Sequence, residues 1–317
     1  MQSTLLPYAY FDGRIVPIEE AKVSVATHAL QYGTGVFGGI RGYLDQDGST
    51  INIFRLPDHF RRFTQSAGLI KVRLPLPPAG LGDLAVELTR RNHPTGNVYF
   101  RPYAYKAGHD LGPTLTGIAD GFALYMLPLD DYYGGEESHG LAVMVSSWQR
   151  LADSAIPARG KVSGAYVNSA IAKDEAQVYG FDDAILLNER GKVSEGSGCN
   201  LFMVRNGVVI TPPVTANILE GITRRTLLQL ARDAGIPTAE RDIDRTELYI
   251  ADELFFCGTG VQVTYIGQVD RRPVGAGALG PITRQLQTRF FDIVRGKAPE
   301  YAHWLTQVAL PAPVHAD

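Results

Sequence analysis

Two observations in the sequence predict a two-domain protein of the α/β or α+β class. The chain has 317 residues, which is more than one ordinary hydrophobic core encloses. Strand patterns dominate its first part, whereas the second half mixes helical segments with short β-branched or aromatic strands. An acidic, glycine-rich stretch without periodicity lies between them. We therefore expect a small N-terminal domain over 1–130, an interdomain loop over 131–140 and a larger domain over 141–317.

The strands of the first part are predicted from turn dipeptides and from alternation of apolar and polar residues. Asp-Gly pairs at 12–13 and 47–48 are strong turn signals, and each lies between two runs with strand character. Hairpins are therefore expected over 8–17 and 44–54. The other expected strands are 97–106, 121–129 and, after the interdomain loop, a buried strand over 141–148.

The helices are predicted from apolar residues at helical spacing. Pro57 suits the first turn of a helix, because its missing N–H needs no partner there. The apolar face expected after it consists of Phe60, Phe63, Ala67 and Ile70. Later helices are expected over 165–179, 221–235, 246–251 and 280–296, and the end of the chain, 310–317, is expected to fray.

Composition narrows the classes of function. The net charge is −3, and the Lys/Arg clusters are only dipeptides, so we expect no nucleic-acid partner. No apolar run is long enough to span a bilayer, and the first residues lack a signal-peptide pattern, so we expect no membrane partner. Cys199 and Cys257 alone form neither a disulfide framework nor a metal site. A reducing cytoplasm is the expected location.

Lys161 is the first candidate for chemistry. It lies in the segment IPARGKVSGAY, just before a predicted helix, and its neighbours from Gly160 to Gly164 have little side-chain bulk. Such a lysine can reach a flat ligand, and partial desolvation makes its amine a better nucleophile toward an aldehyde. A loop lysine at a helix start is the alternative interpretation.

Glu195 is a candidate partner for a protonated heterocycle. In GKVSEGSGCNLFMV it stands between two strands, with Gly196 and Gly198 beside it, so a ligand can approach it closely. A pyridine ring that must store electrons needs an acidic partner for its nitrogen. The alternative is an ordinary glutamate in a turn.

Two further segments offer donors to an anion. Gly221 precedes an amphipathic helix, and the free N–H groups of Ile222 and Thr223 would hold a phosphate together with the helix dipole. The run Gly258-Thr259-Gly260 joins two strands and exposes backbone N–H groups and a hydroxyl. A helix start and a hairpin turn without a ligand explain these segments equally well.

Polar residues of the first part add candidates. Arg62, in DHFRRF, has the planar guanidinium that matches phosphate. Tyr99 and Arg101 share one face of a strand, because side chains alternate with period two. Such a pair suits a substrate carboxylate or, alternatively, a cross-strand ion pair. His28 is interpreted as a structural histidine in a segment rich in glycine and aromatic residues.

Taken together, these segments resemble the branched-chain amino acid aminotransferases, class IV enzymes of pyridoxal-phosphate (PLP) fold type IV. The matching pieces are HALQYGTGVFGGIR, HFRRF, VYFRP, SSWQRLADSAIPARGKVSGAYVNS, SEGSGCNLF, EGITR and CGTGVQVT. They run from about residue 8 to residue 270, which is most of the chain. The resemblance implies a small N-terminal α/β domain and a larger C-terminal mixed, β-barrel-like domain.

The resemblance also implies roles for the candidate residues. Lys161 looks like the Schiff-base lysine and proton shuttle, Glu195 like the partner of the pyridine nitrogen, and Tyr166 like the contact to the phenolic oxygen. The implied phosphate site consists of Arg62, Ile222, Thr223 and Thr259. The implied substrate site consists of Tyr99, Arg101, Thr259 and Gly260 on the carboxylate side and Tyr32 and Phe37 as apolar walls.

The implied reaction is transamination of branched-chain L-amino acids with 2-oxoglutarate. It proceeds by ping-pong kinetics through the Lys161 Schiff base, with pyridoxal 5'-phosphate as cofactor. Amino acids and 2-oxo acids are the implied small-molecule partners. A homodimer or higher homo-oligomer is implied as well.

Three features depart from the family pattern. Gly38 and Cys199 stand where members often carry acidic residues, and the loop 107–117 does not match the usual glycine-rich substrate loop. Two alternatives therefore remain on the same fold, a transaminase for D-amino acids or (R)-amines and an aminodeoxychorismate-type lyase. A non-catalytic PLP-binding protein is a further alternative, which the intact Lys161 and Glu195 disfavour.

Overall fold

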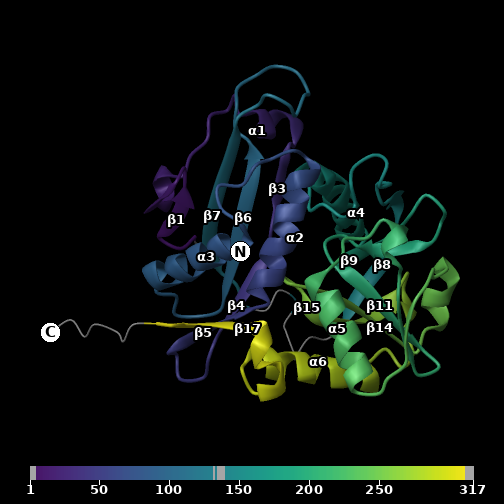
Figure 1. Cartoon of the computed structure of the whole chain (residues 1–317). Helices are drawn as coiled ribbons and strands as arrows, with labels where there is room; N and C mark the ends of the chain where they lie inside the picture. The colour runs from purple at the N-terminus through teal and green to yellow at the C-terminus, as the bar shows by residue number, and fades with distance from the viewer. Residues whose placement is uncertain (1–4, 131–132, 134–139, 311–317) are drawn as a thin grey trace. The chain divides into compact units, whose positions relative to one another are not determined.

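The computed structural model describes residues 5–130, 133 and 140–310 (Figure 1). The chain divides into two compact units, and each is described by itself. The first unit comprises Met1–Asp130, Gly160–Gly164 and Asp292–Asp317, and the second comprises Asp131–Arg159 and Ala165–Phe291. Most of the segment expected to fray, 310–317, and most of the expected interdomain loop lie outside the described residues.

The first unit contains an antiparallel sheet that, in the described residues, has eight strands. Seven follow the order β17-β5-β4-β6-β7-β1-β2, and β3 pairs with β6. The two predicted hairpins are confirmed, since β1 pairs with β2 and β4 with β5. The strands are β1 (Tyr8–Phe11), β2 (Arg14–Pro17), β3 (Gly35–Phe37), β4 (Ile40–Leu44), β5 (Thr50–Phe54), β6 (Val98–Lys106), β7 (Asp120–Pro128) and β17 (Leu305–Ala309).

Two longer helices pack against each other and against this sheet, in front of its strands in Figure 1. The predicted helix is α2 (Leu56–Leu69), and its expected apolar residues are buried, although Ile70 follows the helix as its C-cap. α3 (Pro78–Asn92) was not predicted, because the prolines and glycines at its start are typical of a loop. The short helices are η1 (Ile18–Glu20), α1 (His28–Tyr32) and η6 (Pro299–Trp304).

The second unit contains a mixed sheet of nine strands in the described part of the chain. Its order is β10-β9-β8-β15-β14-β11-β12-β13, with β16 paired to β15. β8 is parallel to β9 and β15, and β12 is parallel to β13. The strands are β8 (Leu141–Gln149), β9 (Asp183–Leu187), β10 (Val193–Gly196), β11 (Asn200–Arg205), β12 (Val208–Thr211), β13 (Thr238–Glu240), β14 (Glu253–Gly258), β15 (Gln262–Val269) and β16 (Arg272–Pro273).

The helices of the second half confirm three of the four helical predictions. They are α4 (Tyr166–Val178), α5 (Ile222–Asp233) and α6 (Pro281–Val294), of which the last three residues belong to the first unit. The segment expected as a helix over 246–251 is a 3₁₀ helix, η5 (Arg245–Ile250). The other short helices are η3 (Ser163–Ala165) and η4 (Val214–Ala216).

The fold is therefore of the mixed α and β class that the sequence predicted. In the second unit, apolar side chains from strands on both sides of β14 form one buried cluster. Phe202 and Phe255 stack with ring centroids 5.0 Å apart, and both are fully buried. No helix within the described residues is long and apolar enough to cross a membrane.

Candidate active site

The backbone of Lys161 is held by α2 and β3 of the first unit. Its N–H donates to Ser66 Oγ at 3.2 Å, and its carbonyl accepts from the Phe37 N–H at 3.0 Å. Gly33 and Gly164 make this anchoring possible. Gly33 has φ +65°, and a Cβ placed there would lie 2.8 Å from the Gly164 Cα. The chain around the lysine therefore requires glycine at this close approach.

The side-chain amine of Lys161 lies near an aromatic ring. Its Nζ lies 5.0 Å from the centroid of the Phe37 ring. The Arg101 guanidinium lies 4.7 Å from the same ring and 5.2 Å from the Tyr99 ring. Tyr99 and Arg101 are therefore on one face of β6, as the alternation predicted. In the first unit, an amine and a guanidinium therefore lie near one apolar ring, and a phenol lies beside that guanidinium.

Arg101 carries unused hydrogen-bonding capacity. Among the described residues its contacts are the two aromatic rings, and its buried Nε has no hydrogen-bond partner. A buried donor without a partner is costly, so its retention favours a role toward a ligand. An anion with two oxygens, such as a carboxylate, matches the guanidinium best.

Tyr32 and His28 hold the loop 107–117 at Gly112. The Gly112 N–H donates to the Tyr32 hydroxyl at 3.1 Å, and His28 Nε2 lies 3.0 Å from the Gly112 carbonyl. His28 is fully buried, and its Nδ1 lies 2.7 Å from Thr34 Oγ1. These contacts are consistent with the predicted structural role of His28. They also tie the expected substrate wall, Tyr32, to the loop that departs from the family pattern.

The glycines before β4 leave no room for side chains. A Cβ on Gly38 would lie 2.5 Å from Pro102 Cγ, and a Cβ on Gly39 would lie 1.9 Å from the Tyr99 hydroxyl oxygen. Real Cβ atoms do not approach other atoms this closely. An acidic residue at position 38 would therefore require movement of Pro102, which follows Arg101 on β6.

Glu195 lies at the centre of a polar network in the second unit. Its side chain is 8% exposed, and Oε1 pairs with Arg150 Nη2 at 3.0 Å. Oε2 accepts from Asn200 Nδ2 at 2.9 Å and from the Leu219 N–H at 3.1 Å. Three donors on one carboxylate favour its charged form. An anionic Glu195 is what a protonated ring nitrogen needs.

The start of α5 has the features of an anion site. Its N-cap is Gly221, and no side chain in the described residues caps it. The first N–H groups of an α-helix have no partner within the helix, so Ile222 and Thr223 offer backbone donors. Arg224, in the first turn of α5, is buried and donates to the Pro212 carbonyl at 2.9 Å.

The run Gly258-Thr259-Gly260 lies at a hairpin turn between β14 and β15. The two strands pair up to Gly258 and Gln262, so the turn consists of Thr259, Gly260 and Val261. Thr259 and Gly260 are half-buried, and a Cβ on Gly260 would meet no atom within 4 Å. Open space above a glycine lets a ligand approach the backbone.

The predicted site residues fall into two sets, one in each unit. Lys161, Phe37, Tyr99 and Arg101 are brought together by the contacts above. The first unit holds Tyr32, Phe37, Arg62, Tyr99, Arg101 and Lys161, and the second holds Tyr166, Glu195, Ile222, Thr223, Thr259 and Gly260. Arg62 lies on α2 and Tyr166 begins α4, and both are half-buried.

Two residues of the Glu195 network were missed from the sequence. Arg150 follows β8 and Asn200 begins β11, so their pairing with Glu195 depends on how the strands assemble. The only available signal was local. Asn200 stands in the same SEGSGCN run as Glu195, and a polar residue beside a glycine turn is a candidate partner.

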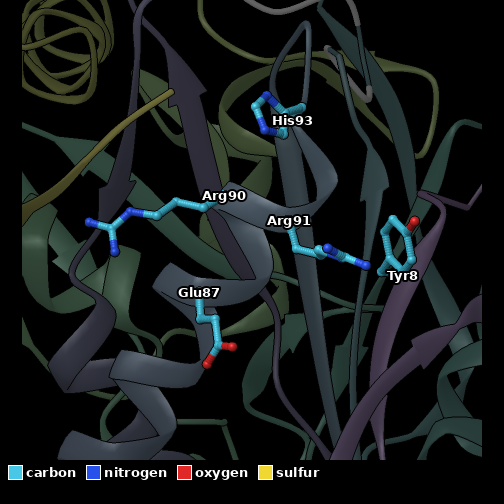
Figure 2. Close-up of a pocket in the computed structure, with 5 residues that line it drawn as sticks. All are labelled: Tyr8, Glu87, Arg90, Arg91 and His93. Atoms are coloured by element: carbon cyan, nitrogen blue, oxygen red, sulfur yellow. The ribbon is translucent and has the colours of Figure 1, made fainter. Parts of the chain in front are cut away.

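An open hollow elsewhere in the first unit contains none of these residues. It is lined by Tyr8, Glu87, Arg90, Arg91 and His93. Figure 2 shows that Arg90 and Arg91 point in opposite directions, with Arg91 over the Tyr8 ring at 4.6 Å. The basic side chains do not converge on a common point, so the hollow adds nothing to the candidate site.

Comparison with known proteins identifies the class of enzyme. Residues 35–269 match the family model described as amino-transferase class IV. The chain therefore belongs to the class IV aminotransferases, which confirms the resemblance stated from its motifs. It is 42% identical over 309 residues to a probable branched-chain-amino-acid aminotransferase of Aquifex aeolicus, covering 97% of this chain and 99% of that protein.

Solved structures of branched-chain aminotransferases have the same fold. The enzyme of Thermoproteus uzoniensis with norvaline has a TM-score of 0.91 and 41% identity, covering 96% of this chain and 100% of that one. The enzyme of Thermobaculum terrenum in its PLP form has a TM-score of 0.92 and 39% identity, covering 96% of this chain and 99% of that one. The fold type expected from the sequence is thus confirmed.

Proposed function

We propose that this protein is a PLP-dependent transaminase that transfers the amino group of branched-chain L-amino acids to 2-oxoglutarate by ping-pong kinetics. The observation that carries the proposal is the cluster around Phe37. Lys161 and Arg101 lie near the Phe37 ring, and Tyr99 lies beside Arg101, with which it forms the proposed carboxylate-binding pair. An aliphatic amino acid needs these three kinds of contact. Relatives named as branched-chain enzymes support the same substrate class.

The residues present fit pyridoxal 5'-phosphate. Lys161 would carry the cofactor, and Glu195 would be the anion for its ring nitrogen. Tyr166 would contact its phenolic oxygen. Bound PLP supplies an electron sink for the bond that breaks at the substrate Cα. The proposed phosphate donors are the backbone N–H groups of Ile222 and Thr223 and the side chains of Arg62 and Thr259.

Hydrogen-bond donors around Glu195 and at the start of α5 support the binding of PLP. Glu195 is held as an anion by a guanidinium and two N–H donors, so it suits a protonated nitrogen. The uncapped start of α5 in the described structure presents N–H groups and a positive dipole end to a phosphate.

Lys161 then acts as the proton carrier. With PLP bound, the Nζ of Lys161 would take the proton from the substrate Cα and deliver it on the cofactor side. The hydrogen bonds of its backbone to Ser66 and Phe37 fix the base of its side chain. Tyr99 and Arg101 bind the substrate carboxylate, with the turn at Thr259-Gly260 as a further donor.

The second substrate returns the active site to its starting form. Arg101 lacks an acidic partner among the described residues, so its guanidinium suits the carboxylate that both substrates carry. Phe37 and Tyr32 offer apolar surface to the branched side chain of the first substrate. In this proposal the same residues therefore bind the amino acid and the 2-oxo acid in alternate half-reactions.

A homodimer or higher homo-oligomer belongs to the same proposal. Val25, Leu30 and Leu111 are 84%, 64% and 86% exposed in the isolated chain. Large aliphatic side chains are rarely this exposed in a cluster of neighbouring segments, and a second copy would cover them. Light scattering of the purified protein measures this directly, and a monomer at micromolar concentration would contradict it.

An amino-donor screen with 2-oxoglutarate tests the substrate class. L-leucine and L-valine are expected to give higher kcat/KM than D-alanine and (R)-1-phenylethylamine. Equal or greater activity with (R)-1-phenylethylamine would favour the (R)-amine alternative, for which Gly38 and the loop 107–117 are the motivating departures. Release of pyruvate from aminodeoxychorismate without any 2-oxo acid acceptor would favour the lyase alternative.

Lys161→Ala tests the cofactor lysine. The purified variant should lose the absorbance band at about 410 nm after dialysis, because that band reports the lysine-bound cofactor. Lys192→Ala is the matched control, since Lys192 pairs with Asp244 and has no proposed role. A Lys161→Ala protein that kept the band would exclude Lys161 as the carrier.

A further inference from the structure

Asn200 connects two segments to which the proposed function gives separate roles. Its Nδ2 donates to Glu195 Oε2 and to the Leu219 carbonyl, both at 2.9 Å. Glu195 is the proposed anion for the ring nitrogen, and Leu219 lies two residues before Gly221, the N-cap of the proposed phosphate helix. The side-chain amide of Asn200 is buried, at 5% exposure, so water does not replace these bonds easily.

Gly221 leaves space for the same Asn200 amide, because it has no Cβ. A Cβ on Gly221 would lie 2.0 Å from Asn200 Oδ1, with Arg224 Cβ as the next side chain at 3.4 Å. The backbone of Gly221 has φ −66°, which any residue adopts, so its backbone conformation does not require glycine. Glycine is required instead because the Asn200 amide occupies the space that a Cβ would need.

The Leu219 N–H closes the connection. It donates to Glu195 Oε2 at 3.1 Å, the same oxygen that Asn200 binds. Asn200, Glu195 and Leu219 therefore form a ring of three hydrogen bonds. Arg150 holds the other carboxylate oxygen at 3.0 Å, from the segment after β8. The carboxylate and the start of α5 cannot shift independently without breaking at least one of these bonds.

We propose that Asn200 is a positioning residue that sets the separation between Glu195 and the start of α5, and that Gly221 is required to admit its amide. The proposal rests on the proposed function, because it assumes that these two segments bind the ring nitrogen and the phosphate of PLP. A rigid ligand with two fixed binding groups gains affinity only where both protein groups are held at matching distance. The side-chain amide of Asn200 would hold Glu195 and the start of α5 at such a fixed distance.

The test is the affinity of apoenzyme variants for PLP, measured by equilibrium dialysis. Asn200→Ala is expected to weaken PLP binding by roughly 10- to 150-fold, the range for lost hydrogen bonds to a charged group. Binding of inorganic phosphate alone, measured by competition, should change less than twofold, because phosphate uses only one of the two segments. Asn92→Ala is the matched control, since Asn92 is also buried and donates to the Tyr8 carbonyl.

A double-mutant cycle separates positioning from general damage. Gly221→Ala should weaken PLP binding in the native background, because its Cβ meets Asn200 Oδ1. The same change should have little further effect in Asn200→Ala, which lacks that atom. Asn200→Asp keeps the shape but places an oxygen beside Glu195, so the pH profile of the absorbance band at about 410 nm should shift.

Three results would overturn the proposal. They are PLP affinity in Asn200→Ala equal to that in Asn92→Ala, an equal loss for PLP and phosphate, and additive effects of Asn200→Ala and Gly221→Ala. Native protein that fails to bind PLP would instead refute the proposed function. Native binding with an unaffected Asn200→Ala would refute the positioning role alone.

Discussion

Gly39→Ala changes the substrate side of the proposed site through Tyr99. An alanine Cβ at position 39 would lie 1.9 Å from the Tyr99 Oη and 2.7 Å from its Cζ. Ordinary van der Waals contact begins at 3.4 Å, so the hydroxyl must move by about 1.5 Å. Tyr99 is 9% exposed, so its ring has little free space into which to turn.

The size of the effect follows from the hydrogen bond that this movement breaks. The hydroxyl of Tyr99 is proposed to donate to the substrate carboxylate, and a displacement of about 1.5 Å exceeds the tolerance of a hydrogen bond. A hydrogen bond to a charged group contributes about 1.5–3 kcal/mol. The expected loss in kcat/KM is therefore roughly 10- to 150-fold.

Steady-state kinetics with L-leucine and 2-oxoglutarate measure this loss. Tyr99→Phe should cause a similar loss, and Gly39→Ala should add little to it, because both act through one hydroxyl. Gly68→Ala is the control, since a Cβ on this exposed helical glycine meets nothing within 4 Å. It should leave kcat/KM unchanged and raise stability by about 0.5–1 kcal/mol. A Gly39→Ala enzyme within twofold of the native kcat/KM would show that the Tyr99 hydroxyl does not bind the substrate carboxylate.

Three further predictions concern stability and thiol chemistry. Hydrogen bonds from Arg241 lower the pKa of Glu247 from 4.5 to about 2, so its contribution is complete above pH 4.5 and is lost as the pH falls toward 2. Urea unfolding of Glu247→Gln should therefore show a loss of about 1–3 kcal/mol at pH 7 that disappears near pH 2; an equal difference at both pH values would contradict this. Phe255→Ala should lower the free energy of unfolding by about 3–5 kcal/mol, because its fully buried ring stacks on a neighbouring ring; a loss below about 1 kcal/mol in urea unfolding would exclude that packing. Burial raises the pKa of the thiols of Cys199 and Cys257, so a chromogenic disulfide reagent at about pH 8 should react with neither until the protein is unfolded; rapid reaction of the native protein would show that a thiol is accessible.

Local patterns predicted most elements of the fold but missed those that depend on context. Turn dipeptides and alternation were enough for the hairpins, since both signals are contained within a few residues. α3 was not predicted because its first five residues include Pro78, Gly80 and Gly82, which favour loops in isolation. Its helical form depends on burial of Leu81 and Leu88 against the rest of the unit, which no local pattern reports.

The short segment 246–251 shows that a local pattern can also predict an α-helix where none forms. Its apolar spacing fits a helix, but it spans little more than one turn. The structure has a 3₁₀ helix there, begun by reciprocal hydrogen bonds between Asp244 and Glu247. Such a capping box was readable in the sequence as an Asp followed three residues later by a Glu.

The residues of the candidate site differ in the same way. Some can be recognised from their neighbours in the sequence, and others only once the fold is known. Lys161 and Glu195 were recognised because each lies among glycines that leave space for a ligand. Their supports, Ser66 for the lysine and Arg150 for the carboxylate, come from distant parts of the chain. Sequence spacing carries no information about such pairs, because the strand order of each unit decides them.

The separate supports of Lys161 and Glu195 have a functional consequence. The lysine is fixed by hydrogen bonds within the first unit, and the carboxylate by hydrogen bonds within the second. Loss of the Ser66 hydroxyl should therefore loosen the proton carrier and lower kcat, while leaving the bonds around Glu195 intact. Loss of the Asn200 amide should weaken cofactor binding first, while leaving the backbone bonds of Lys161 intact. In the proposed reaction, proton transfer by Lys161 and cofactor binding by Glu195 thus depend on different hydrogen bonds, so substitutions should change one without the other.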